Sequence, residues 1–199
     1  MKPLTKMIVG EGRKYEEDRN SDLFSALRKR HSCRSYDPSR SVPDAILKKL
    51  VYAAHRAPTG GGKPYRFLIV VQDPIQLKML SLISPGLFGK PPLVFVICSK
   101  TKIGNELLPK MDLDECTHID AGAAAENIAL VAYSLGLGAC FVKSYAEIAV
   151  ARLLELPPDT RTEIMVSVGY PSQVSQPPLK KSKKDKLTYI DKYGVELLQ

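Results

Sequence analysis

Several residue types and patterns are scarce or absent in this chain. It has no tryptophan, only three histidines and four cysteines, and no two cysteines form a C-x-x-C pair. Because zinc-ligand spacing is missing, we expect no metal site and mostly buried, reduced thiols, although the sequence leaves a disulfide open. No apolar run reaches the roughly 18 residues of a membrane helix. Residues 1–6 lack the apolar core of a secretory signal, so we expect a cytoplasmic protein.

Two nucleotide-binding motifs are also missing. The chain contains no G-x-x-x-x-G-K-[ST], the loop that cradles nucleoside triphosphates, and no G-x-G-x-x-G after a strand. The sequence therefore does not support a P-loop or a Rossmann dinucleotide site.

Length and composition indicate one soluble domain. The composition, 44% hydrophobic and 25% charged, is ordinary for a globular protein. A chain of 199 residues is long enough to bury a sizeable core. The net charge is +8, and residues 180–186, with five lysines and one aspartate, carry half of it. Such a segment is a solvated tail, a phosphate-binding arm or a nucleic-acid patch. We expect an N-terminal arm over residues 1–20 and a domain over 21–199, with a basic C-terminal arm from about residue 176.

The spacing of apolar residues predicts both helices and strands. Helical periodicity, with Pro43 and Asp73 at helix starts and Gly136 at a helix end, predicts helices at 22–30, 43–57, 74–82, 119–135 and 145–154. The last of these would start with a capping box at Ser144–Glu147. Continuous apolar runs predict strands at 67–71, 93–98 and 164–168, and a further strand within 137–144. The alanine-rich helix at 119–135 should be central, with a subunit contact as one option.

One short segment concentrates groups that bind anions. Arg30, His31, Ser32, Cys33 and Arg34 follow the first predicted helix directly. Guanidinium groups give paired, charge-assisted hydrogen bonds to phosphate and carbonyl oxygens, and a hydroxyl adds a further donor. We interpret the segment as a candidate anion-binding corner. Cys33 is a packing residue in this interpretation, because nothing in the sequence indicates a reactive thiol.

Three later segments have weaker signals when each is taken alone. Residues 57–65 contain three consecutive glycines, whose backbone can approach a flat ligand and offer N–H groups, although such segments are often plain loops. Residues 135–144 combine a glycine helix stop with an apolar strand. The last segment is Gly169-Tyr170-Pro171, followed by the lysine-rich tail.

Taken in order, these segments resemble the nitroreductase family of FMN-dependent oxidoreductases. The resemblance runs from Asp22 to Tyr189 and rests on Arg30-x-Ser32-x-Arg34, Ala57-Pro58-Thr59-Gly60, Asn127 with Leu135-Gly136-Leu137-Gly138, and Gly169-Tyr170-Pro171. It implies a single-domain α+β fold with a mostly antiparallel central sheet surrounded by helices. It also implies a homodimer with FMN at the subunit interface. Such enzymes oxidise NADH or NADPH and reduce nitroaromatic, quinone or similar acceptors in a ping-pong cycle.

The resemblance also implies roles for individual residues. Arg30 would contact the FMN phosphate, His31 and Ser32 the ribityl chain and phosphate, and Arg34 the flavin N1 and C2 carbonyl. The remaining predicted contacts are the turn at Pro58, Thr59 and Gly60 beside the ring, the backbone of Phe141, Lys143 and Ser144 facing N5, and Lys181 and Lys183 at the phosphate. Lys184 fits the last role as well as Lys183. Hydride transfer at N5 needs no protein acid or base, so no catalytic side chain is predicted.

The chain departs from the family pattern in its second segment. Gly61-Gly62-Lys63 stands where many members have asparagine and glutamine, with one residue fewer, and Tyr65 stands where many have tryptophan. These changes leave open another FMN reaction, such as reductive dehalogenation, heterocycle oxidation or flavin fragmentation. The basic tail leaves open a nucleic-acid-binding module, although zinc-finger spacing and aromatic-interleaved basic stretches are absent.

Overall fold

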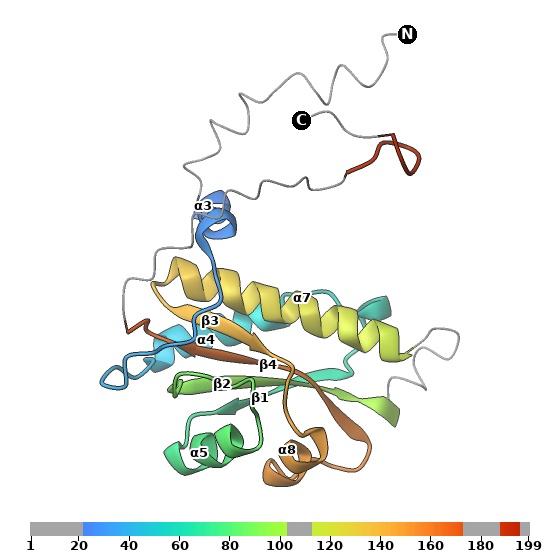
Figure 1. The fold of residues 1–199 in the computed structure, drawn as a ribbon. Helices are drawn as coiled ribbons and strands as arrows, with labels where there is room; N and C mark the ends of the chain where they lie inside the picture. Colours follow the sequence, from blue (N-terminus) through green and yellow to red (C-terminus); the bar gives the residue numbers. More distant parts are fainter. Residues whose placement is uncertain (1–21, 103–112, 173–187, 196–199) are drawn as a thin grey trace.

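The computed structural model describes residues 22–102, 113–172 and 188–195 (Figure 1). The predicted N-terminal arm and the phosphate contacts of Lys181, Lys183 and Lys184 lie outside these residues. Within them, no helix is both long and apolar enough to cross a membrane. The four cysteines all lie in the described part and are unpaired.

A four-stranded sheet with the order β1-β2-β4-β3 forms the centre of the fold. Its strands are β1 (Arg66–Val71), β2 (Leu93–Lys100), β3 (Gly138–Val142) and β4 (Thr160–Gly169), and every pairing between them is antiparallel. β2 is buried along all but its last residue, as its continuous apolar run predicts. The predicted strands are thereby confirmed, and so is the antiparallel α+β architecture.

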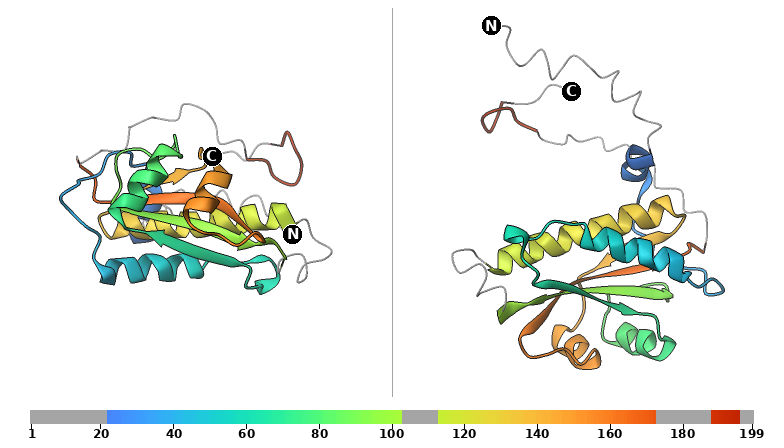
Figure 2. Two further views of the ribbon diagram at one scale, coloured as in Figure 1. Left: turned by 90° about the horizontal axis from the view of Figure 1, so that it is seen from below. Right: turned by 180° about the vertical axis from the view of Figure 1, so that it is seen from behind.

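Helices cover both faces of the sheet (Figures 1 and 2). Two lie on one face, α4 (Asp44–His55) and α7 (Leu113–Ser134), and two on the other, α5 (Pro74–Leu82) and α8 (Glu147–Leu153). A further helix, α3 (Asp22–Lys29), projects beyond α7, and a single 3-10 turn, η2 (Gly60–Gly62), precedes β1. The Asp73 carboxylate caps α5 by accepting from the Gln76 N–H, as predicted.

The alanine-rich helix α7 is central, as expected from its composition. It contacts α3, α4, η2 and all four strands. Five of its buried positions carry alanine, so neighbours can approach its backbone closely there. These positions are Ala121, Ala124, Ala125, Ala129 and Ala132.

Two helix starts differ from the prediction. α7 begins six residues before Ile119, at Leu113, and its first turns are held by polar contacts to β4 rather than by an apolar stripe. The predicted capping box at Ser144 is wrong, because α8 starts at Glu147 without a side-chain cap. The Ser144 carbonyl instead accepts a hydrogen bond from the Gly86 N–H at 3.0 Å, which holds residue 144 outside the helix.

Candidate functional site

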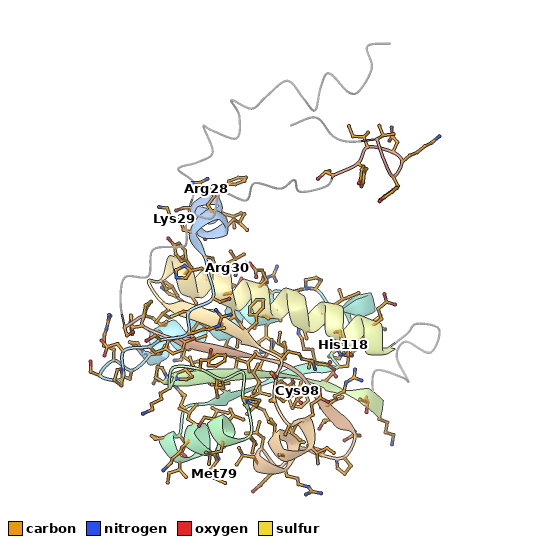
Figure 3. The ribbon with its side chains drawn as sticks, viewed as in Figure 1. Arg28, Lys29, Arg30, Met79, Cys98 and His118 are labelled. Carbon is orange, nitrogen blue, oxygen red and sulfur yellow. The ribbon has the colours of Figure 1, made fainter. Side chains whose placement is uncertain are left out.

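The Arg30–Arg34 corner leaves the end of α3 and crosses α7. The Arg30 Nε lies 2.9 Å from the Glu126 carboxylate of α7, and the two side chains are about one third exposed, 32% and 35%. In Figure 3, Arg30 lies above α7, close to Arg28 and Lys29 at the end of α3. The corner is therefore fixed to α7 by a charged contact that a bound anion could replace.

The corner is held against β3 by one buried residue. The Cys33 N–H donates to the Ala139 carbonyl at 2.9 Å, and Ser32 forms a bridge with the same residue. Cys33 packs where a Cβ on Gly138 would lie, only 2.5 Å from the Cys33 sulfur. Burial raises the pKa of the Cys33 thiol, which favours its neutral form and agrees with a packing role. Ser32 and Arg34, on either side, are exposed.

The residues after the corner join it to the end of β4. The Tyr36 hydroxyl donates to the Cys33 carbonyl at 2.7 Å and lies 2.8 Å from the Ser167 hydroxyl. Tyr36 also forms a bridge with Pro171, and the Asp37 N–H donates to the Tyr170 carbonyl at 2.8 Å. The first, third and fourth segments of the sequence pattern therefore meet at one edge of the sheet.

This edge of β3 has peptide groups available beyond the corner. Neighbouring residues of a strand point their N–H and C=O groups to opposite edges. Because the Ala139 carbonyl points away from β4 to Cys33, the N–H and C=O of Phe141 point the same way. In the part of the chain that the structure describes, no backbone group pairs with them there, and the carbonyl accepts from the Cys140 thiol at 3.5 Å. The Phe141 side chain is 39% exposed, so this position is open to a ligand.

Lys143 and Ser144 follow Phe141 but are engaged within the protein. The Lys143 ammonium donates to Glu147 at 2.9 Å on the surface of α8, and the Ser144 carbonyl accepts from Gly86. The predicted role of both residues is a backbone contact, and the Lys143 side chain reaches the first residue of α8, Glu147.

The loop with Pro58, Thr59 and Gly60 lies on another face of α7. The Gly60 N–H donates to the Asp120 carboxylate at 2.8 Å. Asp120 and Glu126 are six residues apart, which is about 9 Å along a helix axis and about 120° around it. One protomer therefore does not bring this loop and the corner to the same face of α7.

Arg66 and Asn127 shape the start of this loop. The Arg66 guanidinium donates to four carbonyls at 2.8–3.2 Å, those of Ala54, Ala57, Pro58 and Asp120. Asn127 donates to the Ala53 carbonyl at 3.1 Å. Together they add side-chain donors to the carbonyls at the end of α4 and at the start of the loop. Burial lowers the pKa of Arg66, but the group stays cationic at neutral pH.

Sequence reasoning missed Arg66 and Asp120. Neither belongs to a local pattern, because Asp120 meets the Gly60 amide across 60 residues and the Arg66 guanidinium meets the Asp120 carbonyl across 54. The packing of α7 against η2 and β1 creates these contacts. The only available signals were an arginine at the start of a buried strand and a carboxylate in an alanine-rich helix.

A groove lies between α3, α4 and α7. It has a volume of about 690 Å³ and a mostly apolar lining that includes Leu23, Tyr52, Ala53, Val131 and Leu135. Neither Ser32 nor Thr59 lines it. The side of the molecule that carries α3 thus offers an open apolar surface next to the corner.

Comparison with known proteins agrees with this arrangement. A model of the nitroreductase family matches residues 27–85 and 80–170. The chain belongs to the nitroreductase family. This confirms the resemblance found in the sequence.

Among family relatives, a protein from Archaeoglobus fulgidus named as an NADH dehydrogenase/NAD(P)H nitroreductase is 32% identical over 150 residues, which are 71% of this chain and 81% of the relative. The FMN reductase (NADPH) of Bacillus subtilis is 28% identical over 160 residues, covering 68% of this chain and 63% of the relative. An FMN-dependent nitroreductase structure from Clostridium difficile superimposes with a TM-score of 0.73 at 26% identity, covering 86% of this chain and all of that one. The nitroreductase fold is thus confirmed.

The residues at the corner fit a flavin mononucleotide chemically. An FMN phosphate needs several cationic and hydroxyl donors, and Arg30, Ser32 and Arg34 supply them within five residues. The flavin ring system carries hydrogen-bonding atoms along its edge, and beside the corner Phe141 presents an N–H that pairs with nothing in the described residues. For this nitroreductase-family chain, the donor set and the open strand edge suit the same ligand.

Proposed function

We propose that this protein is an FMN-dependent oxidoreductase that oxidises NADH or NADPH and reduces nitroaromatic, quinone or similar acceptors, acting in the cytoplasm. The observation that carries the proposal is the meeting of the Arg30–Arg34 corner with the open edge of β3 in a chain of the nitroreductase family. Relatives named as NAD(P)H nitroreductase and FMN reductase support the same activity.

In this proposal, the corner binds the cofactor and the strand edge orients it. Arg30 binds the phosphate once it leaves Glu126, and His31 and Ser32 contact the phosphate and ribityl chain. Arg34 would favour negative charge at the pyrimidine end of the ring system. The peptide groups of Phe141 and Lys143 would face its N5 side. When bound, FMN supplies hydride chemistry at N5, so the protein's task is binding, orientation and access.

The loop at Pro58, Thr59 and Gly60 is proposed to complete the site from a second protomer. Because the loop and the corner occupy different faces of α7, one copy of the chain holds only part of the predicted contact set. A homodimer that packs around α7 would bring the loop of one protomer to the corner of the other. The open groove between α3, α4 and α7 supports such packing.

The first test is flavin binding by the full-length protein. Purified protein, alone or after addition of FMN, should show the absorption of bound oxidised flavin and quench FMN fluorescence on titration. Arg30→Ala should raise the FMN dissociation constant at least tenfold, whereas Glu126→Gln should lower it because the guanidinium is released. Arg152→Ala, in α8 on the opposite face, is the matched control. A protein that binds no FMN would overturn the proposal.

A second test separates the reductase from other FMN reactions. The loop lacks the asparagine and glutamine side chains that are common in the family. This difference motivates the alternative, an FMN enzyme with another reaction. Rapid mixing of the FMN-loaded protein with NADH or NADPH should bleach the flavin within the turnover time. Slow bleaching with both nucleotides would favour the alternative reaction.

A further inference from the structure

Two buried polar side chains, Tyr65 and Asp120, restrain the glycine loop at residues 58–63. Neither is among the proposed flavin contacts. Tyr65 is fully buried and Asp120 is 7% exposed. The Tyr65 hydroxyl donates to an Asp120 carboxylate oxygen, and the Gly60 N–H donates to the same oxygen at 2.8 Å and lies 3.0 Å from the tyrosine oxygen. Because these three groups are hydrogen-bonded to one another, they hold the loop backbone in one conformation.

These contacts decide which groups of the loop remain for a ligand. The Gly60 N–H is taken by Asp120 and Tyr65, the Gly62 N–H donates to the Thr59 carbonyl at 2.8 Å, and the Lys63 N–H donates to the Gly60 carbonyl at 3.2 Å. Gly61 is exposed, and no contact within the described ranges occupies its N–H. Within the described residues, its amide and the hydroxyl of the half-buried Thr59 remain available to a ligand.

The loop cannot hold this shape by itself. Gly61 and Gly62 have φ values of 57° and 67°, a region that glycine enters freely, and the two residues have many alternative conformations. Burial, together with the Asp120 carboxyl, raises the pKa of Tyr65 to about 12, so its hydroxyl keeps the proton that it donates. The restraint is therefore present throughout the neutral pH range.

We propose that Tyr65 and Asp120 are positioning residues that hold the Gly60 amide away from the ligand and thereby present Thr59 and the Gly61 amide to the flavin. This inference rests on the proposed FMN function. It explains how a loop without the usual asparagine and glutamine side chains still makes a defined contact: the contact comes from the backbone, and buried side chains set its direction.

The test is a double-mutant cycle on FMN affinity. Tyr65→Phe removes the donor to Asp120 and should raise the FMN dissociation constant about tenfold, and Thr59→Ala should raise it severalfold in the wild-type background. If Tyr65 acts through the loop, Thr59→Ala should have little further effect in the Tyr65→Phe variant. Additive effects, or an unchanged dissociation constant in Tyr65→Phe, would overturn the inference.

Two further variants separate positioning from loss of stability. Asp120→Asn keeps an oxygen acceptor for Gly60 and should bind FMN nearly as wild type, whereas Asp120→Ala should behave like Tyr65→Phe. Val150→Ala, in α8 on the opposite face, should destabilise the fold while leaving FMN affinity unchanged. Failure of Asp120→Asn to retain affinity, together with a loss in Val150→Ala, would assign the effect to general destabilisation and overturn the inference.

The inference can be judged apart from the proposed function. Absence of FMN binding by the wild-type protein would defeat the proposed function. In that case, amide hydrogen exchange of the ligand-free protein tests the restraint directly, since peptides covering residues 57–63 should exchange faster in Tyr65→Phe than in Val150→Ala. Equal exchange in the two variants would overturn the positioning role by itself.

Discussion

The absence of a side chain at Gly138 positions the Arg30–Arg34 corner. A Cβ there would lie 2.4 Å from the Cys33 Cβ and 2.5 Å from its sulfur, closer than packed atoms allow. We expect Gly138→Ala to displace the corner from β3, to lower the free energy of unfolding by about 1–3 kcal/mol, and to weaken FMN binding. Urea unfolding and FMN titration measure the two effects.

The matched control for this change is another glycine-to-alanine substitution. A Cβ at Gly122 in α7 meets nothing within 4 Å, and alanine is favoured over glycine in a helix by about 1 kcal/mol. Gly122→Ala should therefore leave FMN affinity unchanged and raise stability. Equal FMN affinity in Gly138→Ala and wild type would contradict the role given to the corner.

At the residue scale, the sequence predicted the ligand-binding side chains but not the residues that they contact in the fold. The arginines and the serine of the corner were identified because donor-rich clusters are recognisable from residue type alone. Glu126 as the partner of Arg30, and Asp120 as the partner of Gly60, depend on how helices pack, and no local pattern encodes that. Asn127 was singled out with the third segment, and the structure gives it a contact with the end of α4.

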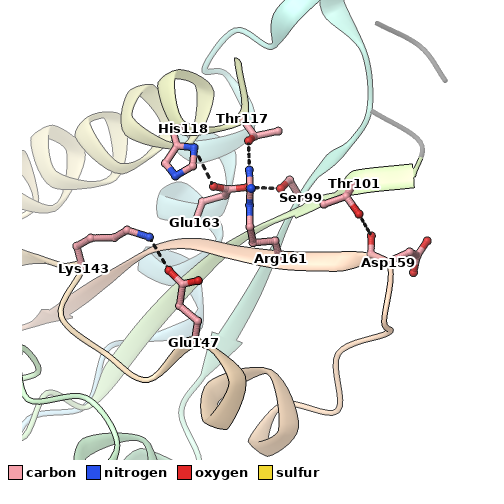
Figure 4. Close-up of polar contacts among 9 residues, drawn as sticks. All are labelled: Ser99, Thr101, Thr117, His118, Lys143, Glu147, Asp159, Arg161 and Glu163. Carbon is pink, nitrogen blue, oxygen red and sulfur yellow. Dashed lines mark hydrogen bonds and ion pairs between the residues drawn. The ribbon is translucent and has the colours of Figure 1, made fainter. Parts of the chain in front are cut away.

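Among the elements, β4 and α7 are joined by a buried carboxylate. The register of β4 against β2 shifts next to Cys98, which makes Glu163 an extra residue in the strand. Glu163 accepts from the Ser99 hydroxyl and from the Arg161 Nε at 3.1 Å, and its other oxygen lies 3.7 Å from the His118 Nδ1 of α7 (Figure 4). Arg161 also donates to Thr117 at 2.7 Å.

This join predicts the cost of losing the carboxylate. Glu163→Ala removes the acceptor for two buried or half-buried donors and should lower the free energy of unfolding by about 3–5 kcal/mol. Glu163→Gln keeps the shape and one acceptor, so it should lose less. Chemical denaturation compares the two variants. Equal stability of Glu163→Ala and wild type would show that Glu163 does not join α7 to β4.

Elements were predictable where burial alone decides them. Continuous apolar runs identified three strands, and helical spacing identified the helices, because each pattern reflects one buried face. The first turns of α7 were missed since contacts with Glu163 and Arg161, about 45 residues away in sequence, hold them in place. The capping box at Ser144 failed for the same kind of reason, as Gly86 binds its carbonyl.

For the whole molecule, alkaline pH should weaken the fold. Burial raises the pKa of Tyr36, and it raises the pKa values of Tyr65 and Tyr145 to about 12. An unfolded tyrosine ionises near pH 10. Between about pH 10 and 12 the unfolded chain therefore loses protons that the folded chain keeps, so the free energy of unfolding falls as pH rises. Below this window these groups leave stability unchanged.

Urea unfolding at a series of alkaline pH values measures this slope. Tyr145→Phe removes one of the three groups, so the slope should become shallower by about one proton. A slope that is the same in Tyr145→Phe and wild type would show that Tyr145 does not contribute to it.

The proposed homodimer is also a property of the whole molecule. Leu23 and Leu27 of α3 are 59% and 49% exposed beside the groove that Tyr52 lines. We expect Leu27→Asp to shift the protein toward monomers and to weaken FMN binding in parallel, because the loop of the partner is lost. Light scattering coupled to size exclusion measures the mass. Leu82→Asp, an exposed leucine of α5 on the opposite face, should leave the protein dimeric.

The site as a whole was only partly predictable. The order of the segments along the sequence predicted the family and the fold, because both are determined within a single chain. It also predicted that the glycine loop and the corner contact one flavin, and the structure puts the two on different faces of α7. A one-chain pattern cannot distinguish residues that meet within a protomer from residues that meet across an interface.

The open edge of β3 has a consequence for the protein before it meets its ligand. Among the described residues no strand pairs with this edge at Phe141, and an exposed strand edge is a template to which another polypeptide can add as a strand. A flavin or a second protomer that covers Phe141 would also protect the chain from aggregation. If the proposed flavin is what covers this edge, cells poor in riboflavin should therefore yield less of the protein in soluble form.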